Sequence, residues 1–256
     1  MPFTISHAAA VLPLQKTRLP LAALMIGSMS PDFAYFLPGE PLRELTHSIA
    51  GLFWFCWPVS LGIWFLFVRV LEQPTRALLP DHWHVRFAAS DREISLKKFA
   101  LASAAVVLGA ATHILWDSFT HRGTAVVGAL PALHEVAFYY HGWRIRWFVL
   151  LQHLSSLFGL LALLVWAWRL PPNQNTPREL PSTSHATRMR AVGILIASSL
   201  GLAIADYAIN ADTWFMRRLF HFAIGGMTGF VLAWFAIAFF VTRRADRSVT
   251  APIPRE

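Results

Sequence analysis

Three residues of the stretch His113-Ile-Leu-Trp-Asp117-Ser-Phe-Thr-His121 combine side-chain types and a spacing that suit metal chemistry. The two imidazoles and the carboxylate are four residues apart, so on an α-helix they lie along one face. They end an apolar run that begins near Phe99, which predicts the last turns of a buried or membrane-spanning helix. Ionisable groups in that position are costly unless they are paired, hydrated or bound to a metal. The alternative is a polar helix end that hydrogen-bonds to its neighbours and to lipid headgroups.

Other histidines and aspartates extend this candidate site. Histidine and carboxylate without thiolate favour zinc, manganese or ferrous iron over a structural thiolate zinc site. The single cysteine, Cys56, lies inside an apolar run and is interpreted as a packing residue. The sequence therefore predicts a bound divalent metal, zinc or manganese. The minimal predicted ligands are Asp32, His47, His113 and Asp117, with His7 and His121 as further ligands or as ligands of a second ion.

The composition indicates that membrane-spanning helices position these residues. The chain has 256 residues, of which 55% are hydrophobic and 14% are charged, and its mean hydropathy is +0.47. These values predict an all-α, polytopic transmembrane helical bundle. A single integral membrane domain is expected over residues 1–242, followed by a basic cytoplasmic tail, 243–256. Five clear spans are predicted at residues 49–71, 99–120, 148–168, 191–209 and 219–241.

A sixth apolar segment, residues 19–37, is interrupted by Gly27, Ser30, Pro31 and Asp32. This pattern predicts a broken or re-entrant N-terminal helix, because irregular backbone at membrane depth must be covered by protein or by a wet cavity. This interpretation determines whether His7 lies on the same side of the membrane as the other candidate ligands. If the segment crosses the membrane completely, His7 lies on the far side from the other candidates; if it is re-entrant, His7 can join them.

The distribution of lysine and arginine predicts the orientation. The formal net charge is +8, and the basic residues form short clusters between apolar runs, which is typical of membrane flanks and argues against nucleic acid as a partner. Most of them fall on the side that holds the C-terminus, which is therefore predicted to be cytoplasmic. The polar residues of the apolar segments then gather at the outer membrane face. Besides the motif, this group comprises Asp32, His47, Gln152, His153, Asp206, Asn210, Asp212 and His221. For His153, Asp206 and His221, interhelical hydrogen bonding is favoured over ligation.

The connector between the second and third spans is basic and aromatic, and it is expected to lie at the membrane interface. It contains Arg122, Tyr139, Tyr140, Arg144 and Arg146, which could hold an anionic lipid headgroup. A lipid or lipid-linked substrate is therefore expected, with Arg122, Gln152 and His153 as its predicted contacts. The sequence specifies no oligomeric state.

Several separate blocks carry a resemblance to a known family: MPFTISHAAAVLPL, GSMSPDFAYFL, THSIAGLFWFCWPV, HILWDSFTH and LLQHLSSLFGLL. Together they resemble the bacterial domain-of-unknown-function 4184 family over most of the first ~165 residues. The scheme of an early His, a Pro-Asp, a Thr-His-Ser and a His-x-x-x-Asp is more distantly similar to inner-membrane metal-dependent hydrolases and to zinc-dependent phospholipase C enzymes. The resemblance implies an all-helical membrane protein with a divalent-metal site at His7, Asp32, His47, His113 and Asp117. The chain lacks the first histidine of the longer HRGxTHS block of the distant hydrolases.

The functional hypothesis is a membrane-embedded, metal-dependent hydrolase in the bacterial inner membrane that acts on a phosphoester of a lipid or lipid-linked substrate. Asp117 and His121 are its predicted catalytic residues. The alternative is a non-enzymatic membrane protein, either a transporter or a structural partner, whose polar cluster packs helices. A transporter favours broken helices in both halves and polar groups on both sides of the midplane. The sequence shows one broken segment and a one-sided cluster, which favours the hydrolase.

Overall fold

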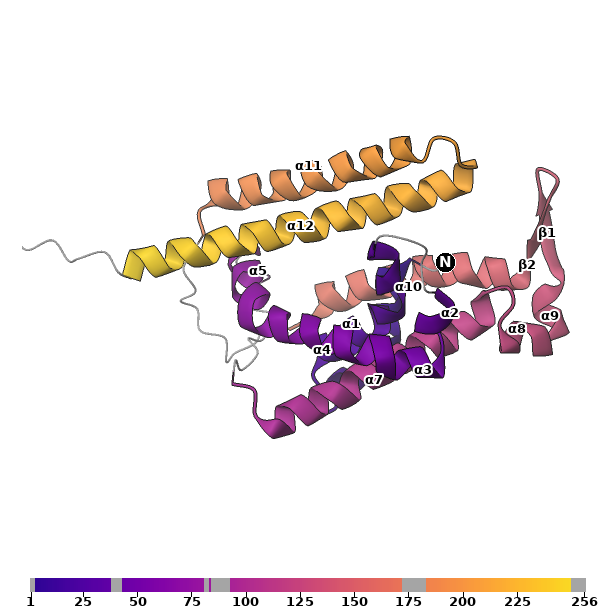
Figure 1. Ribbon diagram of the computed structural model, residues 1–256, viewed down its shortest axis with the longest axis horizontal. Coiled ribbons are helices and arrows are strands. Elements are labelled where there is room, and N and C mark those ends of the chain that lie inside the picture. Colours follow the sequence, from indigo (N-terminus) through magenta and orange to yellow (C-terminus); the bar gives the residue numbers. More distant parts are fainter. Residues whose placement is uncertain (1–2, 38–42, 81–82, 84–92, 172–182, 250–256) are drawn as a thin grey trace, which may run out of the picture. The chain divides into compact units, whose positions relative to one another are not determined.

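The computed structural model describes residues 3–37, 43–80, 83, 93–171 and 183–249, and these are predominantly helical (Figure 1). The prediction of an all-α bundle is confirmed. The chain divides into two compact units, the first made of residues 1–65 and 93–170 and the second of residues 66–92 and 171–256. The prediction of a single domain over residues 1–242 with a separate tail stays a prediction.

Five helical segments are long and apolar enough to cross a membrane, as the sequence predicted. Their mean hydropathies lie between 1.8 and 2.1, and the shortest has 23 residues. At 1.5 Å per residue that segment is about 34 Å long, enough for a hydrocarbon core of about 30 Å. These properties indicate a multi-pass membrane protein. The segments are Ile49–Leu78, Leu96–Ala129, Trp147–Arg169, His185–Ile209 and Arg217–Val241.

The N-terminal segment is broken, as predicted. It consists of the 3₁₀-helix η1 (Thr4–Lys16), the α-helix α1 (Leu21–Met29) and a second 3₁₀-helix, η2 (Ser30–Phe36). With nine residues, α1 is about 14 Å long and cannot cross a bilayer. Pro31 lies in the first turn of η2, where its missing N–H costs no helical hydrogen bond. Residues 21–36 therefore stay helical, and the helix changes from α to 3₁₀ geometry at Ser30.

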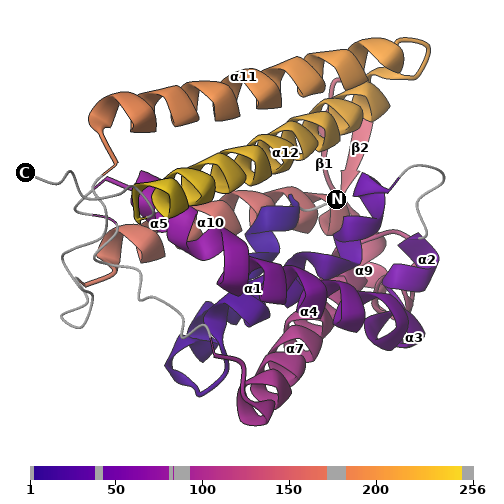
Figure 2. The ribbon, with the colours of Figure 1, turned by 60° about the vertical axis from the view of Figure 1, so that its left-hand side comes forward.

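Helix α1 packs closely against α7 (Leu96–Thr120), and Figure 2 shows the two elements beside each other. Glycines make this approach possible. A Cβ atom at Gly27 would overlap the backbone oxygen of Val106, and one at Gly109 would overlap that of Leu24. Small residues allow helix backbones in membranes to approach in this way. The contact brings Asp32, in the first turn of η2 just beyond α1, towards the last turns of α7.

Replacement of Gly109 by alanine is expected to destabilise the first unit by about 1–3 kcal/mol, because the added methyl group overpacks the contact between α1 and α7. Thermal unfolding in detergent, followed by fluorescence-detected size exclusion, measures the effect. Gly62→Ala is the matched control, since a Cβ atom at Gly62 meets nothing within 4 Å. Equal melting temperatures for the two variants would contradict this account of the packing.

The segment Ile49–Leu78 contains two stretches of wider π-helix, each followed by a proline. The first, η3 (Leu52–Cys56), precedes Pro58, and the second, η4 (Phe67–Leu71), precedes Pro74. A proline removes one helical hydrogen bond and crowds the preceding turn, and the wider turns accommodate it. The remaining elements of this region are α2 (Arg43–Thr46), α3 (Ile49–Gly51), α4 (Trp57–Leu66) and α5 (Glu72–Leu78).

Helix α10 (Trp147–Arg169) holds η1 in place within the first unit. The backbone N–H of Phe3 donates to Ser156 Oγ at 2.9 Å, and Trp166 Nε1 donates to Gln15 Oε1 at 2.6 Å. Gly159 lies against Ser6, with no room for a side chain. These contacts fix the turn of η1 that carries the residue after Ser6, which is His7.

The connector between α7 and α10 has more structure than the sequence analysis assigned to it. It contains the short helices α8 (Ala125–Ala129) and α9 (Pro131–His134) and an antiparallel hairpin of β1 (Val136–Tyr140) and β2 (Trp143–Arg146). The hairpin was not predicted. Its signal in the sequence is the two-residue turn His141-Gly142 between two aromatic runs.

The second unit contains α5 and a long hairpin of α11 (His185–Ile209) and α12 (Phe215–Val249), which lie side by side (Figure 1). Gly225 and Gly229 of α12 permit close contact with α11. Trp234 Nε1 donates to Thr75 Oγ1 at 2.7 Å and joins α12 to α5. Helix α12 continues to Val249, into the predicted tail. Residues 172–182 of the predicted flexible loop, and residues 250–256, lie outside the described part.

Candidate metal centre

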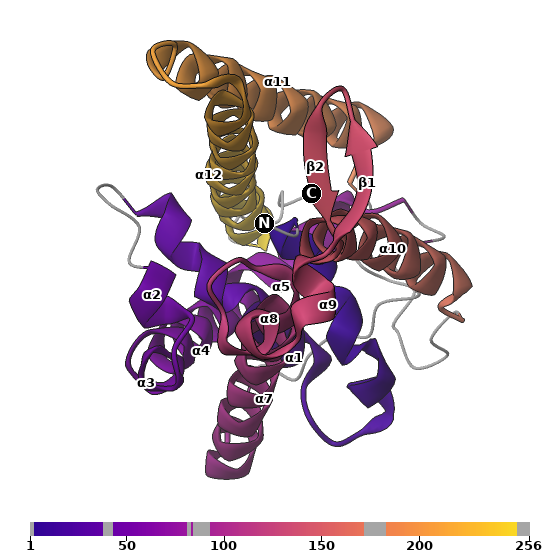
Figure 3. The same cartoon turned by 90° about the vertical axis from the view of Figure 1, so that its right-hand side faces the viewer.

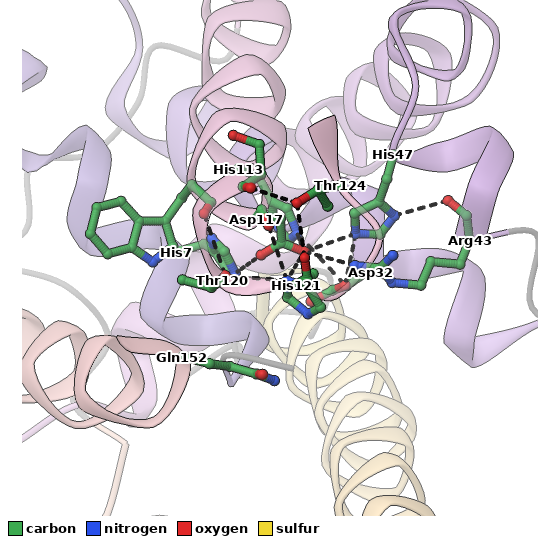
Figure 4. A network of polar contacts seen from close by, with 12 residues as sticks. His7, Asp32, Arg43, His47, His113, Asp117, Thr120, His121, Thr124 and Gln152 are labelled. Carbon is green, nitrogen blue, oxygen red and sulfur yellow. Dashed lines mark hydrogen bonds and ion pairs between the residues drawn. The ribbon is translucent and has the colours of Figure 1, made fainter. Parts of the chain in front are cut away.

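Six ionisable side chains from distant parts of the sequence meet in the first unit (Figure 4). They come from η1, from η2, from the turn between α2 and α3, from the last turns of α7 and from the residue that follows α7. None of the six side chains is more than 12% exposed. We call this group the His/Asp cluster; its members are His7, Asp32, His47, His113, Asp117 and His121.

Asp117 lies at the centre of the cluster. Its Oδ1 is 3.6 Å from His7 Nε2, and its Oδ2 is 3.4 Å from His47 Nε2 and 3.6 Å from His113 Nε2. Asp32 holds a second position, since its Oδ1 lies 3.5 Å from His47 Nε2 and 3.7 Å from His113 Nε2. Each carboxylate is thus surrounded by imidazole nitrogens.

These separations distinguish a network of direct hydrogen bonds from a set of ligands that share a metal ion, and they fit the second. They exceed the usual 2.7–3.2 Å of a hydrogen bond to oxygen. Two ligand atoms on one tetrahedral ion, with bonds of about 2.0–2.1 Å, lie about 3.3 Å apart. One buried side-chain N or O atom in each of the six residues has no hydrogen-bond partner: His7 Nε2, Asp32 Oδ1, His47 Nε2, His113 Nε2, Asp117 Oδ1 and His121 Nε2.

Such orphaned atoms are rare in proteins and call for a missing partner. A divalent cation supplies one for several atoms at once. Two groups in the described part of the chain have ligand atoms close enough to share an ion, His7 with Asp32 and His113, and His47 with His113 and Asp117. The cluster can therefore hold a metal ion.

Hydrogen bonds around the cluster favour one tautomer for His113 and for His47. His113 Nδ1 lies 2.7 Å from the backbone oxygen of Ser28, and His47 Nδ1 lies 3.1 Å from that of Arg43. A carbonyl oxygen only accepts, so in each pair Nδ1 carries the proton and the lone pair of Nε2 faces the cluster. Thr4 Oγ1 donates to Asp32 Oδ2 at 2.8 Å, which leaves Oδ1 directed inward. This pattern is common around metal-binding histidines and carboxylates.

His7 lies in the cluster, which answers the question left open by the sequence. Its ring stacks on that of His113 with centroids 3.6 Å apart, as the re-entrant alternative predicts. Burial, with a smaller contribution from His113, lowers the pKa of His7 to about 3. Burial alone would raise the pKa of Asp32, but the nearby His47, His113 and Thr4 hold it below its usual value. A neutral imidazole and an ionised carboxylate are the forms that bind metal.

Comparison with known families agrees with the resemblance of the separate blocks. Residues 1–239 match the family described as Domain of unknown function (DUF4184). The chain belongs to this family. No curated protein and no solved structure matches the DUF4184 chain. The family description names no reaction, so the function of this DUF4184 protein must be argued from its own geometry.

Arg43 is a residue of this DUF4184 centre that the sequence analysis missed. Its guanidinium Nη2 lies 3.2 Å from Asp117 Oδ2, and its side chain is 31% exposed, more than any member of the His/Asp cluster. The sequence did contain a signal, because Arg43 and His47 have the same four-residue spacing as the α7 motif. Arg43 places a permanent positive charge at the edge of the cluster.

The predicted substrate contacts fall in different environments. Gln152 is buried on α10 beside the cluster, and its backbone oxygen accepts from Ser155 Oγ and Ser156 Oγ at 3.0 Å each (Figure 4). His153 and Arg122 are exposed. None of these three residues contributes one of the six orphaned atoms of the cluster.

Asp206 and His221 pair with each other in the second unit. His221 Nδ1 of α12 lies 3.4 Å from Asp206 Oδ1 of α11, and Asn210 Nδ2 donates to the same carboxylate oxygen at 2.9 Å. This agrees with the predicted interhelical contact. Both side chains of the Asp206–His221 pair are partly exposed, so the pair lacks the burial that distinguishes the His/Asp cluster.

Proposed function

We propose that this protein is a membrane-embedded, metal-dependent hydrolase that acts on a phosphoester of a lipid or lipid-linked substrate. The supporting observation is the convergence of six buried imidazole and carboxylate groups, each with an orphaned atom, at the end of a membrane-spanning helix. A cluster that only packed helices would be expected to satisfy its own hydrogen bonds. Here His113, His47 and Asp32 make hydrogen bonds to groups outside the cluster, while their orphaned atoms lie near the other cluster residues.

The proposed metal ligands are His7, Asp32, His47, His113 and Asp117, and the nitrogen and oxygen donors suit zinc or manganese. A bound metal of this kind polarises a phosphoryl oxygen and lowers the pKa of a coordinated water. Asp117 would hold and orient the surrounding imidazoles through its two oxygens. His121 is the proposed proton acceptor, because its Nδ1 faces the backbone oxygen of Asp117 and its Nε2 has no partner.

A phosphoester of a lipid fits the surroundings of the cluster. Arg43 and Arg122 supply positive charge suited to an anionic phosphate. Helix α7, which carries His113 and Asp117, is long and apolar enough to span the membrane, so a substrate anchored in the bilayer could reach the cluster without leaving the membrane. Gln152 and His153 on α10 are the proposed polar contacts to the rest of the headgroup.

Hydrolysis of a phospholipid by the purified protein in nanodiscs tests the proposal. Activity should disappear after treatment with a chelator and return with zinc or manganese, and Asp117→Asn should be inactive under all conditions. Asp206→Asn is the matched control, because it removes a carboxylate from a His–Asp pair outside the cluster. If chelated and metal-loaded wild type released phosphate products at the same rate, the metal-dependent reaction would be ruled out.

Replacement of Arg43 by alanine should separate substrate binding from metal binding. Loss of a charged hydrogen bond to an anionic substrate is expected to lower kcat/KM by about 10-fold or more. Metal affinity should stay the same or rise, because Arg43 no longer competes for Asp117 Oδ2. Kinetics and metal titration measure the two effects, with the exposed Arg18→Ala as control. A joint loss of metal and activity in Arg43→Ala would instead make Arg43 a structural support.

We further propose a bacterial inner-membrane location with the C-terminus in the cytoplasm and the cluster near the outer face. The asymmetric distribution of lysine and arginine supports this orientation. Fusions of alkaline phosphatase, which is active only outside the cytoplasm, test it. A fusion within the connector after Arg122 should be active, and one at the C-terminus should be inactive.

A further inference from the structure

The hairpin of β1 and β2 forms a narrow ribbon that projects beyond α9 and α10 (Figure 3). Its turn is the dipeptide His141-Gly142, with φ angles of 46° and 81°. Positive φ at both central positions is typical of the two-residue turns that match the twist of a hairpin. The tip is therefore a formed β-turn.

The two faces of the ribbon differ in chemistry. Tyr140 pairs with Trp143 and Phe138 with Ile145, so these four side chains share one face, which we call the aromatic face. Tyr139 pairs with Arg144 on the opposite face. On the aromatic face Phe138 is 45% exposed, Tyr140 62% and Trp143 75%. The ribbon is thus amphipathic, and its apolar side is largely uncovered by the described chain.

Within the described part of the chain, the hydrogen bonds that fix the ribbon to the rest of the first unit lie at its base. Arg146 Nη1 lies 3.1 Å from His134 Nδ1, and the backbone N–H of Trp147 donates to the oxygen of Glu135 at 3.2 Å. A two-stranded hairpin with an exposed apolar face is marginal in water. Its aromatic face therefore needs an apolar medium or a partner.

The chain topology indicates that this apolar medium is the lipid bilayer. The hairpin joins α7 to α10, and both helices are membrane spans, so its base lies at a membrane face. Tyrosine and tryptophan are enriched at the membrane interface, and arginine there interacts with lipid phosphates. We propose that the hairpin lies in the bilayer interface, with the aromatic face turned towards the acyl chains and Arg144 towards the phosphates. This anchoring role does not depend on the proposed hydrolase activity.

Fluorescence of single labels in nanodiscs tests the proposal on the full-length protein. In a Cys56→Ala background, which removes the only cysteine, an NBD label is attached at Tyr140→Cys or, as the matched control, at its sequence neighbour Tyr139→Cys. The nanodiscs contain phosphatidylcholine and phosphatidylglycerol, with one protein chain per disc. Trp143→Cys provides a second position on the aromatic face if Tyr140→Cys does not fold.

The label on the aromatic face should emit at shorter wavelength than the label at position 139, and lipids with a nitroxide near the headgroup should quench it. Aqueous iodide should quench position 139 more strongly. Equal iodide quenching at both positions, without quenching by the lipid nitroxide, would show a ribbon in water and overturn the proposal. A blue shift that appears only with two chains per disc would overturn it in favour of self-association.

Discussion

Wild-type protein purified in detergent is expected to retain a divalent metal that His113→Ala loses. His113 belongs to both groups of ligand atoms in the cluster, is fully buried and stacks on His7. Its removal deletes one ligand and leaves a gap beside another. We expect metal affinity to fall by about 100-fold or more, since even an outer-shell partner is worth about 10–100-fold.

Plasma mass spectrometry of the purified proteins gives the metal content, and competition with a chelating dye gives the affinity. His221→Ala is the matched control, because it removes a membrane-helix histidine that is also paired with an aspartate. It should retain the wild-type metal content. If His113→Ala and wild type bound metal equally, the cluster would not be the metal site, and every enzymatic conclusion drawn from it would fail.

Added metal is expected to stabilise the folded wild-type protein, and Asp117→Asn is expected to abolish this stabilisation. With metal at 100 times its Kd, binding to the folded state stabilises wild type by about 2.7 kcal/mol. The variant should gain little from added metal. In chelator the two proteins should have similar melting temperatures, because the amide removes a buried charge while Arg43, which is partly exposed, can be solvated by water.

Thermal unfolding in detergent, with added zinc or with chelator, gives the four melting temperatures of this comparison. Asp206→Asn, measured in parallel, should respond to zinc as wild type does. A purely structural polar network predicts a different result, namely that Asp117→Asn is destabilised equally with zinc and with chelator. That outcome would favour the helix-packing alternative over the metal centre.

Local periodicity made much of the cluster predictable. Four-residue spacing predicted His113, Asp117 and His121 on one helix face; His113 and Asp117 lie on α7, whereas His121 is the extended residue that ends it. The break near Asp32 was expected from Pro31. The convergence of η1, η2 and α7 depends on backbone contacts such as that of Gly109 with Leu24. No periodicity encodes those contacts, so the position of His7 remained open until the structure placed it.

Two features escaped the sequence analysis for different reasons. Arg43 precedes the membrane span, where basic residues are common, and its contact with Asp117 depends on the tertiary fold. The hairpin was interpreted as an interfacial connector with no assigned strands, because its aromatic residues also match a membrane belt. The alternation of its side chains and the His141-Gly142 turn carried the missing signal.

The contacts between η1 and α10 have a consequence for assembly on the ribosome. His7 is the first member of the cluster to be translated, yet the bonds of Phe3 and Gln15 reach Ser156 and Trp166, which emerge much later. Asp32, His47 and the α7 residues can meet before α10 is made. The hydrogen bonds that hold η1 against α10 are therefore expected to form only after the other members of the cluster have been translated, so η1, which carries His7, would be the last of these segments to be fully fixed in place.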